Sequence, residues 1–315
     1  MTVTTSTLTA AVAQSFAMKL LSVPTPYNIH KIPADFQQMP KNGGTTLRQR
    51  RYNALPTSTV PLGNSGINPP PTPLTAVDID AKMSFYGQYI ILNEQVTLQA
   101  KDPVLNEAAK RLGVALRQTE DELTRNMLES TASFINCVGG VNGDNPTEIA
   151  RSDIDDVVKT LQNANAYMIS DSIEGDDKFG TAPVRDAYFA MGSSQLIGDL
   201  ENVPGFIAKA QYPNQDKALR AEWCSIGNVR VLLSSIGSVS SAASTNGADI
   251  YNIFVAGLEA YQCIEQDGYS AQFIYRPPIF SGPLAQNASV GYKFAEVPRI
   301  TNDAWIINLR ATLSV

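Results

Sequence analysis

The chain changes character at residues 102–136, which read DPVLNEAAKRLGVALRQTEDELTRNMLESTASFIN. Asp102 is a good helix N-cap and Pro103 suits the first helical position, because the N–H that proline lacks would have no partner there. From Leu105 to Met127, apolar residues recur at alternating steps of four and three. This period places them on one face of a helix, so the stretch predicts a long helix with a single apolar stripe.

The predicted length of this helix is unusual. Gly139-Gly140 is a strong stop signal after the stripe, so we predict that the helix runs from Pro103 to about Asn136. At 1.5 Å per residue it would be roughly 50 Å long, well beyond an ordinary globular helix. The charged residues of the stretch, Glu120 and Asp121 among them, fall away from the apolar stripe.

The residues before the helix differ from the rest in composition. Of the 19 prolines, 11 lie between Pro24 and Pro103, and residues 1–60 carry six basic side chains against one acidic. Those 60 residues have a formal charge of +5, and because the whole chain carries -6, the remainder carries -11. Residues 1–44 lack sustained periodicity, and we interpret them as an arm. The single histidine, His30, has nothing local to orient it as a base, so we expect it to be exposed or at an interface.

Two extended segments lie between the arm and the helix. Thr45–Leu55 has the composition of a strand, but neither of its sides could be buried in a core of its own. A loop rich in proline and glycine, Pro56–Pro73, follows, and Asp80–Leu98 is extended again. The two segments together predict a long two-stranded projection. Alternation along the first segment places on one side Arg48, Arg50 and Tyr52, and on the other Leu47, Gln49 and Arg51.

After the helix, the sequence predicts a compact region of short alternating helices and strands. A helix is expected over Ser152–Asn163, where Ser152 is a cap and acidic residues occupy the first turn. Short apolar runs bounded by glycine or serine predict buried strands at Tyr188–Met191, Val229–Leu233 and Ile250–Ala256. The polar segments Asp171–Thr181 and Ser234–Asp249 are interpreted as surface linkers.

The last segment is the clearest strand prediction. Apolar residues from Trp305 to Val315 alternate with mostly polar ones, as in a half-buried strand. Val290, Tyr292 and Phe294 make a matching face, so we expect these two segments to form a closing strand pair. One long helix with many strands places the chain in the α+β class.

The sequence lacks the patterns that usually mark an enzyme. It has no CxxC, no HExxH and no GxxxxGK[ST] loop, so we predict no cofactor, no metal site and no catalytic residue. The three cysteines are widely spaced and odd in number, which favours reduced core thiols. No run of 18 apolar residues occurs, and the N-terminus lacks the pattern of a signal peptide, so we expect neither a membrane span nor secretion.

Three charged groups leave alternatives open. Asp155 and Asp156 suit the first turn of a helix. The alternative is that they are acidic catalytic residues of a hydrolase or lyase of unfamiliar type. The acidic loop Asp171–Asp177 is interpreted as solvated, because its spacing does not match a calcium-binding EF-hand. The arginines at 48, 50 and 51, beside Tyr52, suit either nucleic acid or an acidic neighbouring subunit.

The order of arm, projection, long helix, compact region and closing strands resembles the coat-protein fold of tailed bacteriophages, the Hong Kong 97-type or Johnson fold. The most specific stretch is RRYNAL at 50–55, followed by PLG at 61–63 and YGQY at 86–89. IFVAGLEAY at 253–261 and VGYKF at 290–294 resemble the family's A-domain turn and closing strand. In VGYKF, the family often has Trp directly before the lysine, whereas this chain has Tyr292.

This resemblance implies a division of the chain and a set of hinges. In the family's terms, the parts are an N-arm at 1–44, an E-loop at 45–101, a spine helix with P-domain residues at 102–150, an A-domain at 151–268 and closing P-domain strands at 269–315. Copies of such a subunit meet in several settings, so the projection needs hinges, and we place them at Gly63, Gly66 and Gly87.

The resemblance also implies a function, that of a major capsid protein that self-assembles into an icosahedral head around double-stranded DNA. Its partners would be copies of itself in hexamers and pentamers, DNA through non-specific contacts, and cement, portal and scaffolding proteins, with no membrane. The protein would assemble in the host cytoplasm and reside in the virion. An encapsulin-type cellular nanocompartment shell protein is the alternative. The intersubunit contacts that we expect are Arg48, Arg50, Arg51, Tyr52, Leu62, Tyr86 and Tyr89.

Overall fold

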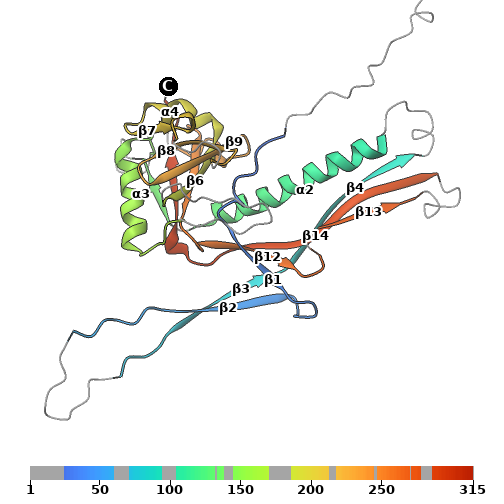
Figure 1. Ribbon diagram of the computed structural model, residues 1–315, viewed down its shortest axis with the longest axis horizontal. Coiled ribbons are helices and arrows are strands. Elements are labelled where there is room, and N and C mark those ends of the chain that lie inside the picture. The colour runs from blue at the N-terminus through green and yellow to red at the C-terminus, as the bar shows by residue number, and fades with distance from the viewer. Residues whose placement is uncertain are drawn as a thin grey trace, which may run out of the picture.

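The computed structural model describes residues 25–59, 71–93, 104–131, 133–137, 145–169, 186–212, 218–244, 247–269, 271–277 and 286–314. The strands of this part of the chain form an eight-stranded sheet, a five-stranded sheet and a two-stranded hairpin. Helix α2 (Val104–Glu129) runs along the five-stranded sheet and ends beside the eight-stranded sheet (Figure 1). It therefore connects the two halves of the molecule.

The eight-stranded sheet is built around strands that are apolar over most of their length. β6 (Tyr188–Ser193), β9 (Val229–Ser234) and β11 (Ile250–Ala256) are buried at every position, as in strands covered on both faces. All three confirm the sequence prediction. The other strands are β5 (Phe134–Asn136), β7 (Phe206–Ala208), β8 (Glu222–Ile226), β10 (Val239–Ser240) and β15 (Ile306–Ala311). Their order is β5-β15-β11-β6-β9-β8-β7, and β10 pairs with β11.

Each face of this sheet has its own apolar cluster. Helix α3 (Arg151–Asn163) contributes Ile154, Val157 and Leu161 to one cluster, and the short helix α4 (Ile197–Asn202) lies at its end. The helix predicted over Ser152–Asn163 is confirmed within one residue. The other face contains Leu128 from α2 and Ile29 from the arm, both fully buried. The described part of the arm therefore contributes to the core.

The five-stranded sheet is organised around one long strand. β14 (Asn287–Ile300) pairs antiparallel with β4 (Ser84–Asn93), β12 (Tyr261–Gln266) and β13 (Gln272–Arg276). The arm adds β1 (Asp35–Met39), which lies parallel to β12. Apolar side chains of α2, β4 and β14 form the core between helix and sheet. The buried members are Leu92, Leu112, Val290, Tyr292 and Phe294.

The two-stranded hairpin begins beside the five-stranded sheet, with one face against it, and extends outward from there (Figure 1). β2 (Thr46–Tyr52) pairs antiparallel with β3 (Ala76–Lys82), and Arg48 lies directly opposite Asp80. A projection is confirmed, but its second strand is not the predicted one. Of the predicted strand Asp80–Leu98, only residues 80–82 belong to the hairpin, as the end of β3. Residues 84–93 form β4, which pairs with β14 in the five-stranded sheet.

The predicted helix is shorter than its sequence pattern indicated. It ends at Glu129, and the segment expected to continue it forms β5, which pairs parallel with β15. The hydroxyl of Ser130 donates to the Met127 carbonyl at 2.6 Å, and the Thr131 hydroxyl donates to Asp303 at 2.7 Å. The first bond satisfies a backbone carbonyl at the helix end, and the second ties the residue after the helix to Asp303. The helix therefore ends before the stop signal at Gly139-Gly140.

The expected closing strand pair is also wrong. β14 lies in the five-stranded sheet, whereas β15 lies between β5 and β11 in the eight-stranded sheet. Both strands have the alternating or apolar pattern, but that pattern does not specify a pairing partner. Within the predicted surface linker Ser234–Asp249, the residues Val239–Ser240 form β10.

Candidate intersubunit surfaces

The outer face of the β2–β3 hairpin carries two ion pairs between opposite strand positions. Arg48 donates from Nε and Nη2 to the two carboxylate oxygens of Asp80 at 2.6 and 2.7 Å. Arg50 binds Asp78 in the same way, at 2.7 and 3.1 Å. Hydrogen bonds from the guanidinium groups lower the pKa of both aspartates below its ordinary value. Tyr52, 59% exposed, ends this face.

This face confirms the predicted grouping of its side chains. Arg48, Arg50 and Tyr52 share one side of the strand, as the alternation indicated. The two guanidinium groups do not form an unpaired basic patch, however, because Asp80 and Asp78 neutralise them within the same chain. The face therefore gives no specific support to nucleic-acid binding or to an acidic neighbour.

The inner face of the hairpin lies on the chain's own five-stranded sheet. Leu47 packs against a buried cluster that includes Met39, and Gln49 hydrogen-bonds with Gln37 and Gln262. Arg51 Nη1 donates to the Thr301 carbonyl at 3.1 Å. The expectation that neither side could be buried is therefore wrong for this side. Its partners are distant in sequence, so the pattern of residues 45–55 alone could not reveal them.

Tyr86 and Tyr89 lie on opposite faces of β4. The Tyr86 ring packs on Phe294 under α2, with ring centroids 5.5 Å apart. Tyr89 is on the other face with Phe85 and Ile91, and these three side chains are 59–70% exposed. We call them the outer aromatic row. Of the two tyrosines expected at intersubunit contacts, only Tyr89 is therefore on an exposed face, and Leu62 lies outside the described residues.

A shallow groove runs beside the outer aromatic row. Its lining includes Tyr89, Ile274 and Gly291, and its volume is about 360 Å³. A Cβ on Gly291 would come within 2.7 Å of the Tyr89 Cβ, and one on Gly87 would come within 2.8 Å of the Tyr292 carbonyl oxygen. Gly87 therefore permits close packing of β4 on β14, and the prediction that it is a hinge of the projection is wrong. Gly63 and Gly66 lie outside the described residues.

The arm is fixed to α2 through His30. Its backbone N–H donates to Asp121 Oδ1 at 2.8 Å, and its Nδ1 lies 2.8 Å from Asp121 Oδ2. The Tyr261 hydroxyl donates to the His30 carbonyl at 2.6 Å. His30 and Asp121 are both buried, so the expectations of an exposed histidine and of an outward aspartate are wrong. Mutual hydrogen bonding lowers the cost of burying this pair.

The next arm residue, Lys31, meets three carboxylates from three different elements. Its Nζ lies 2.9 Å from Glu296 of β14, 3.3 Å from Glu120 of α2 and 3.3 Å from Glu265 of β12. We call these three glutamates the carboxylate cluster. Burial acts to lower the pKa of Lys31, but Glu296 and Glu120 outweigh it and raise the pKa above its ordinary value. Burial raises the pKa of Glu296 to about 7 and also raises that of Glu120.

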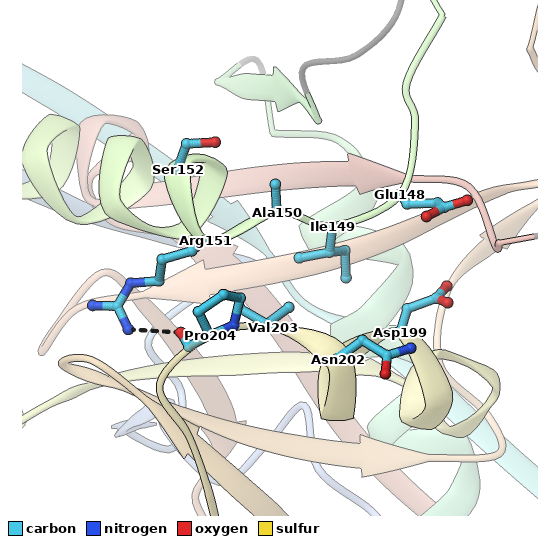
Figure 2. Close-up of a pocket in the computed structure, with 9 residues that line it drawn as sticks. All are labelled: Glu148, Ile149, Ala150, Arg151, Ser152, Asp199, Asn202, Val203 and Pro204. Carbon is cyan, nitrogen blue, oxygen red and sulfur yellow. Dashed lines mark hydrogen bonds between the residues drawn. The ribbon is translucent and has the colours of Figure 1, made fainter.

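A second recess, of about 470 Å³, lies where α3 begins and α4 ends (Figure 2). Arg151 Nη1 donates to the Pro204 carbonyl at 3.4 Å, and its Nε donates to Asp155 at 3.0 Å. Asp199 accepts hydrogen bonds from the backbone and hydroxyl of Ser314. These groups are engaged in contacts within the chain. The lining residues are Glu148, Ile149, Ala150, Arg151, Ser152, Asp199, Asn202, Val203 and Pro204.

The acidic pair in α3 has structural partners. Asp155 binds Arg151 one turn earlier, and Asp156 binds Lys159 at 2.9 Å. Both carboxylates are substantially exposed, with 45% and 54% of their side-chain surface accessible. Pairs of this kind stabilise an exposed helix. Their geometry therefore gives no support to the hydrolase or lyase alternative.

Comparison with solved structures finds phage capsids over nearly the whole chain. The head structure of Helicobacter pylori bacteriophage KHP40 matches with a TM-score of 0.68 and 11% identity, and covers 99% of this chain and 97% of that chain. The capsid of Ralstonia phage GP4 matches with a TM-score of 0.67 and 14% identity, covering 97% and 96%. No family model and no curated protein matches the sequence. The chain has the fold of these capsid subunits, which confirms the predicted fold.

Three further findings concern the described part of the chain. Its three cysteines, Cys137, Cys224 and Cys263, are free and buried, as predicted. No group of three or more histidine, cysteine, aspartate or glutamate side chains there is arranged to hold a metal ion. No helix in these residues is long and apolar enough to cross a membrane.

Proposed function

We propose that this chain is the major capsid protein of a tailed phage, and that its copies assemble as hexamers and pentamers into an icosahedral head around double-stranded DNA. The observation that carries the proposal is the similarity to phage head and capsid structures over 97–99% of the chain. A shared domain alone would not extend through the arm, the hairpin, the long helix and both sheets. The role is structural, and the proposal includes no catalytic step.

In this proposal the parts of the fold take the family's roles. The hairpin is the E-loop, α2 is the spine helix, the eight-stranded sheet belongs to the A-domain, and the five-stranded sheet belongs to the P-domain. This changes the division proposed from the sequence, because β5 and β15 join the A-domain whereas β4 and β12 join the P-domain. A two-stranded hairpin is at best marginally stable alone in water, so a neighbouring subunit would support its outer face. The outer aromatic row would likewise be covered, because contiguous exposed apolar side chains commonly mark interaction surfaces.

The proposed intersubunit contacts follow from these exposed surfaces. On the hairpin they are Arg48, Arg50 and Tyr52, together with Arg51 on the inner face of β2. Leu62, which follows β2 in the sequence, stays part of the proposed set. On the five-stranded sheet the contact is Tyr89, with Phe85 and Ile91. We leave Tyr86 out of this set, since its ring packs within its own chain.

Location and partners complete the proposal. The protein would assemble in the host cytoplasm and reside in the virion, with packaged DNA, portal, scaffolding and cement proteins as further partners. The capsids it resembles include those of Helicobacter, Ralstonia and cyanobacterial phages and of a native GTA particle. We do not favour an encapsulin-type compartment, because no observation supports it over a phage head.

Expression of the chain, followed by sedimentation and electron microscopy, tests this function. We expect capsomer-sized oligomers or closed shells, either from the chain alone or after co-expression with the scaffolding protein of the same phage. A folded monomer of 34.0 kDa that never associates under any of these conditions would contradict the proposal.

A further inference from the structure

We propose that the arm segment 27–39 is a latch for the C-terminal part of α2, residues 120–129. Docking of the arm segment and seating of this part of the helix form one cooperative unit, so that release of the arm also loosens the end of the helix. This latch is a property of the single subunit. It goes beyond the proposed function and does not depend on assembly.

The two parts of α2 are held in different ways. Apolar side chains from the start of the helix as far as Leu123 pack directly against β4 and β14 of the five-stranded sheet. Toward its end, the helix has arm residues beside it. Leu128 of α2 and Ile29 of the arm are both fully buried in the same apolar cluster on the eight-stranded sheet. The end of the helix is therefore seated partly on the arm.

His30 bridges α2 and the five-stranded sheet. Its backbone N–H donates to Asp121 Oδ1 of α2 at 2.8 Å, and its Nδ1 lies 2.8 Å from Asp121 Oδ2. Toward the sheet, Tyr261 of β12 donates its hydroxyl proton to the His30 carbonyl at 2.6 Å. All three residues are at most 1% exposed. Release of the arm would therefore take these partners away from a buried carboxylate, which is costly unless that carboxylate also moves into solvent.

Lys31 makes the same bridge with charge. Its Nζ binds Glu120 on the helix and both Glu265 and Glu296 on the sheet. The side chain of Glu296 is 1% exposed, and those of the other two glutamates are at most 24% exposed. Without the arm, the carboxylate cluster loses this cation, and solvent screens its repulsion poorly. Because one carboxylate is on α2 and two are on the sheet, the repulsion drives the helix away from the sheet.

The arm also has contacts that do not involve α2. Ser234 of β9 donates its hydroxyl proton to the Tyr27 carbonyl at 2.5 Å. β1 pairs with β12 along its whole length. These contacts attach the arm to both sheets independently of the helix. The arm can therefore hold the end of α2 in place.

Hydrogen exchange of the purified subunit, followed by mass spectrometry, tests the latch. Measurement at about pH 8 is above the pKa of Glu296, which burial raises to about 7. In Lys31→Met, we expect protection to fall by about tenfold or more in residues 27–39 and by a similar factor in residues 120–129, while residues 104–116 keep theirs. The matched control Lys159→Met, which removes an exposed lysine from α3, should leave all three segments unchanged. Wild-type protection in either 27–39 or 120–129 of Lys31→Met would overturn the proposal.

Tyr261→Phe distinguishes the latch from a direct effect of charge on the helix. This variant removes the hydroxyl that binds the arm from β12 and changes no charge on α2. We expect protection of residues 27–39 and 120–129 to fall together by about threefold or more. A fall confined to one segment, or no fall in either, would contradict the latch. If Lys31→Met does not fold, Tyr261→Phe provides the test by itself.

A double variant tests the repulsion within the carboxylate cluster. Lys31→Met with Glu265→Gln leaves two carboxylates without the lysine in place of three. Both segments should therefore regain protection by about threefold or more relative to Lys31→Met alone. Failure to regain protection in either segment would overturn the role of charge repulsion in loosening the helix.

Discussion

Arg230 and Glu222 form a buried ion pair inside the eight-stranded sheet. The guanidinium group donates from Nε and Nη2 to the two carboxylate oxygens of Glu222 at 2.7 and 2.5 Å. Tyr212 and the Leu219 backbone also donate to this carboxylate. The guanidinium lies 5.1 Å from the centre of the Phe189 ring. Every charged group of the pair therefore has partners, which is the condition under which buried charges are tolerated.

Removing one member of this pair should be costly. Arg230→Met leaves the Glu222 carboxylate buried without its cation, so we expect the free energy of unfolding to fall by about 3–5 kcal/mol. Arg111→Met, which breaks the exposed helical pair with Glu107, should cost about 0.5 kcal/mol or less. Urea unfolding followed by circular dichroism measures both. Similar losses for the two variants would contradict the assigned difference between the pairs.

At the scale of elements, the hairpin is stiffened by its own charges. Arg48 with Asp80 and Arg50 with Asp78 hold β2 and β3 together on the outer face, while Leu47 holds the root on the five-stranded sheet. A stiff projection loses less conformational entropy when it meets a neighbour. The ion pairs could therefore promote assembly through rigidity, or their charges could contact the neighbour directly.

Two sets of substitutions distinguish these roles. Arg48→Gln with Arg50→Gln should reduce assembly yield several-fold while the subunit stays folded, because both cross-strand pairs are lost. Exchanging the partners, with Arg48→Asp, Asp80→Arg, Arg50→Asp and Asp78→Arg, restores the pairs in reverse. Near-normal particles from the exchanged variant would support rigidity, and particles as scarce as in the glutamine variant would support direct contact. Normal yield from the glutamine variant would contradict any assembly role of these pairs.

The elements differ in how far their sequence patterns could predict them. β6, β9 and β11 were predicted well, because a run buried on both faces is apolar along most of its length. Even there, Arg230 shows that a buried strand can contain a charge when its partner is on the next strand. The pairing of β5 with β15 could not be predicted, since register depends on contacts distant in the chain.

At the candidate surfaces, too, the sequence predicted local groupings of side chains but not contacts between distant parts of the chain. Alternation along 45–55 correctly grouped Arg48, Arg50 and Tyr52, because that grouping is local. The partners Asp78 and Asp80 are about thirty positions away, and the His30–Asp121 contact spans 91 positions. Sequence reasoning also missed the carboxylate cluster, whose members come from three elements. The fold-family resemblance supplied the global arrangement that local patterns lacked.

At the scale of the whole molecule, α2 and the arm connect the two sheets. Leu128 of α2 and Ile29 of the arm lie in the core of the eight-stranded sheet, while Leu112 of α2 packs on the five-stranded sheet. The arm then continues into β1 beside β12. Helix α2 covers one face of the five-stranded sheet, and the outer aromatic row is on the other face. This row therefore remains available to another copy.

Adjacent residues of β4 test which face of the molecule meets its neighbours. Ile91 is 59% exposed in the outer aromatic row, whereas Ile90 packs into the core beneath α2. We expect Ile91→Ala to reduce assembly while changing the free energy of unfolding by no more than about 0.5 kcal/mol. Ile90→Ala should lower that free energy by about 2–4 kcal/mol, because it leaves a cavity between helix and sheet. Urea unfolding of the subunit and particle yield by sedimentation separate the two effects. Full assembly of the stable Ile91→Ala and Tyr89→Ser double variant would show that neighbouring copies do not cover this face.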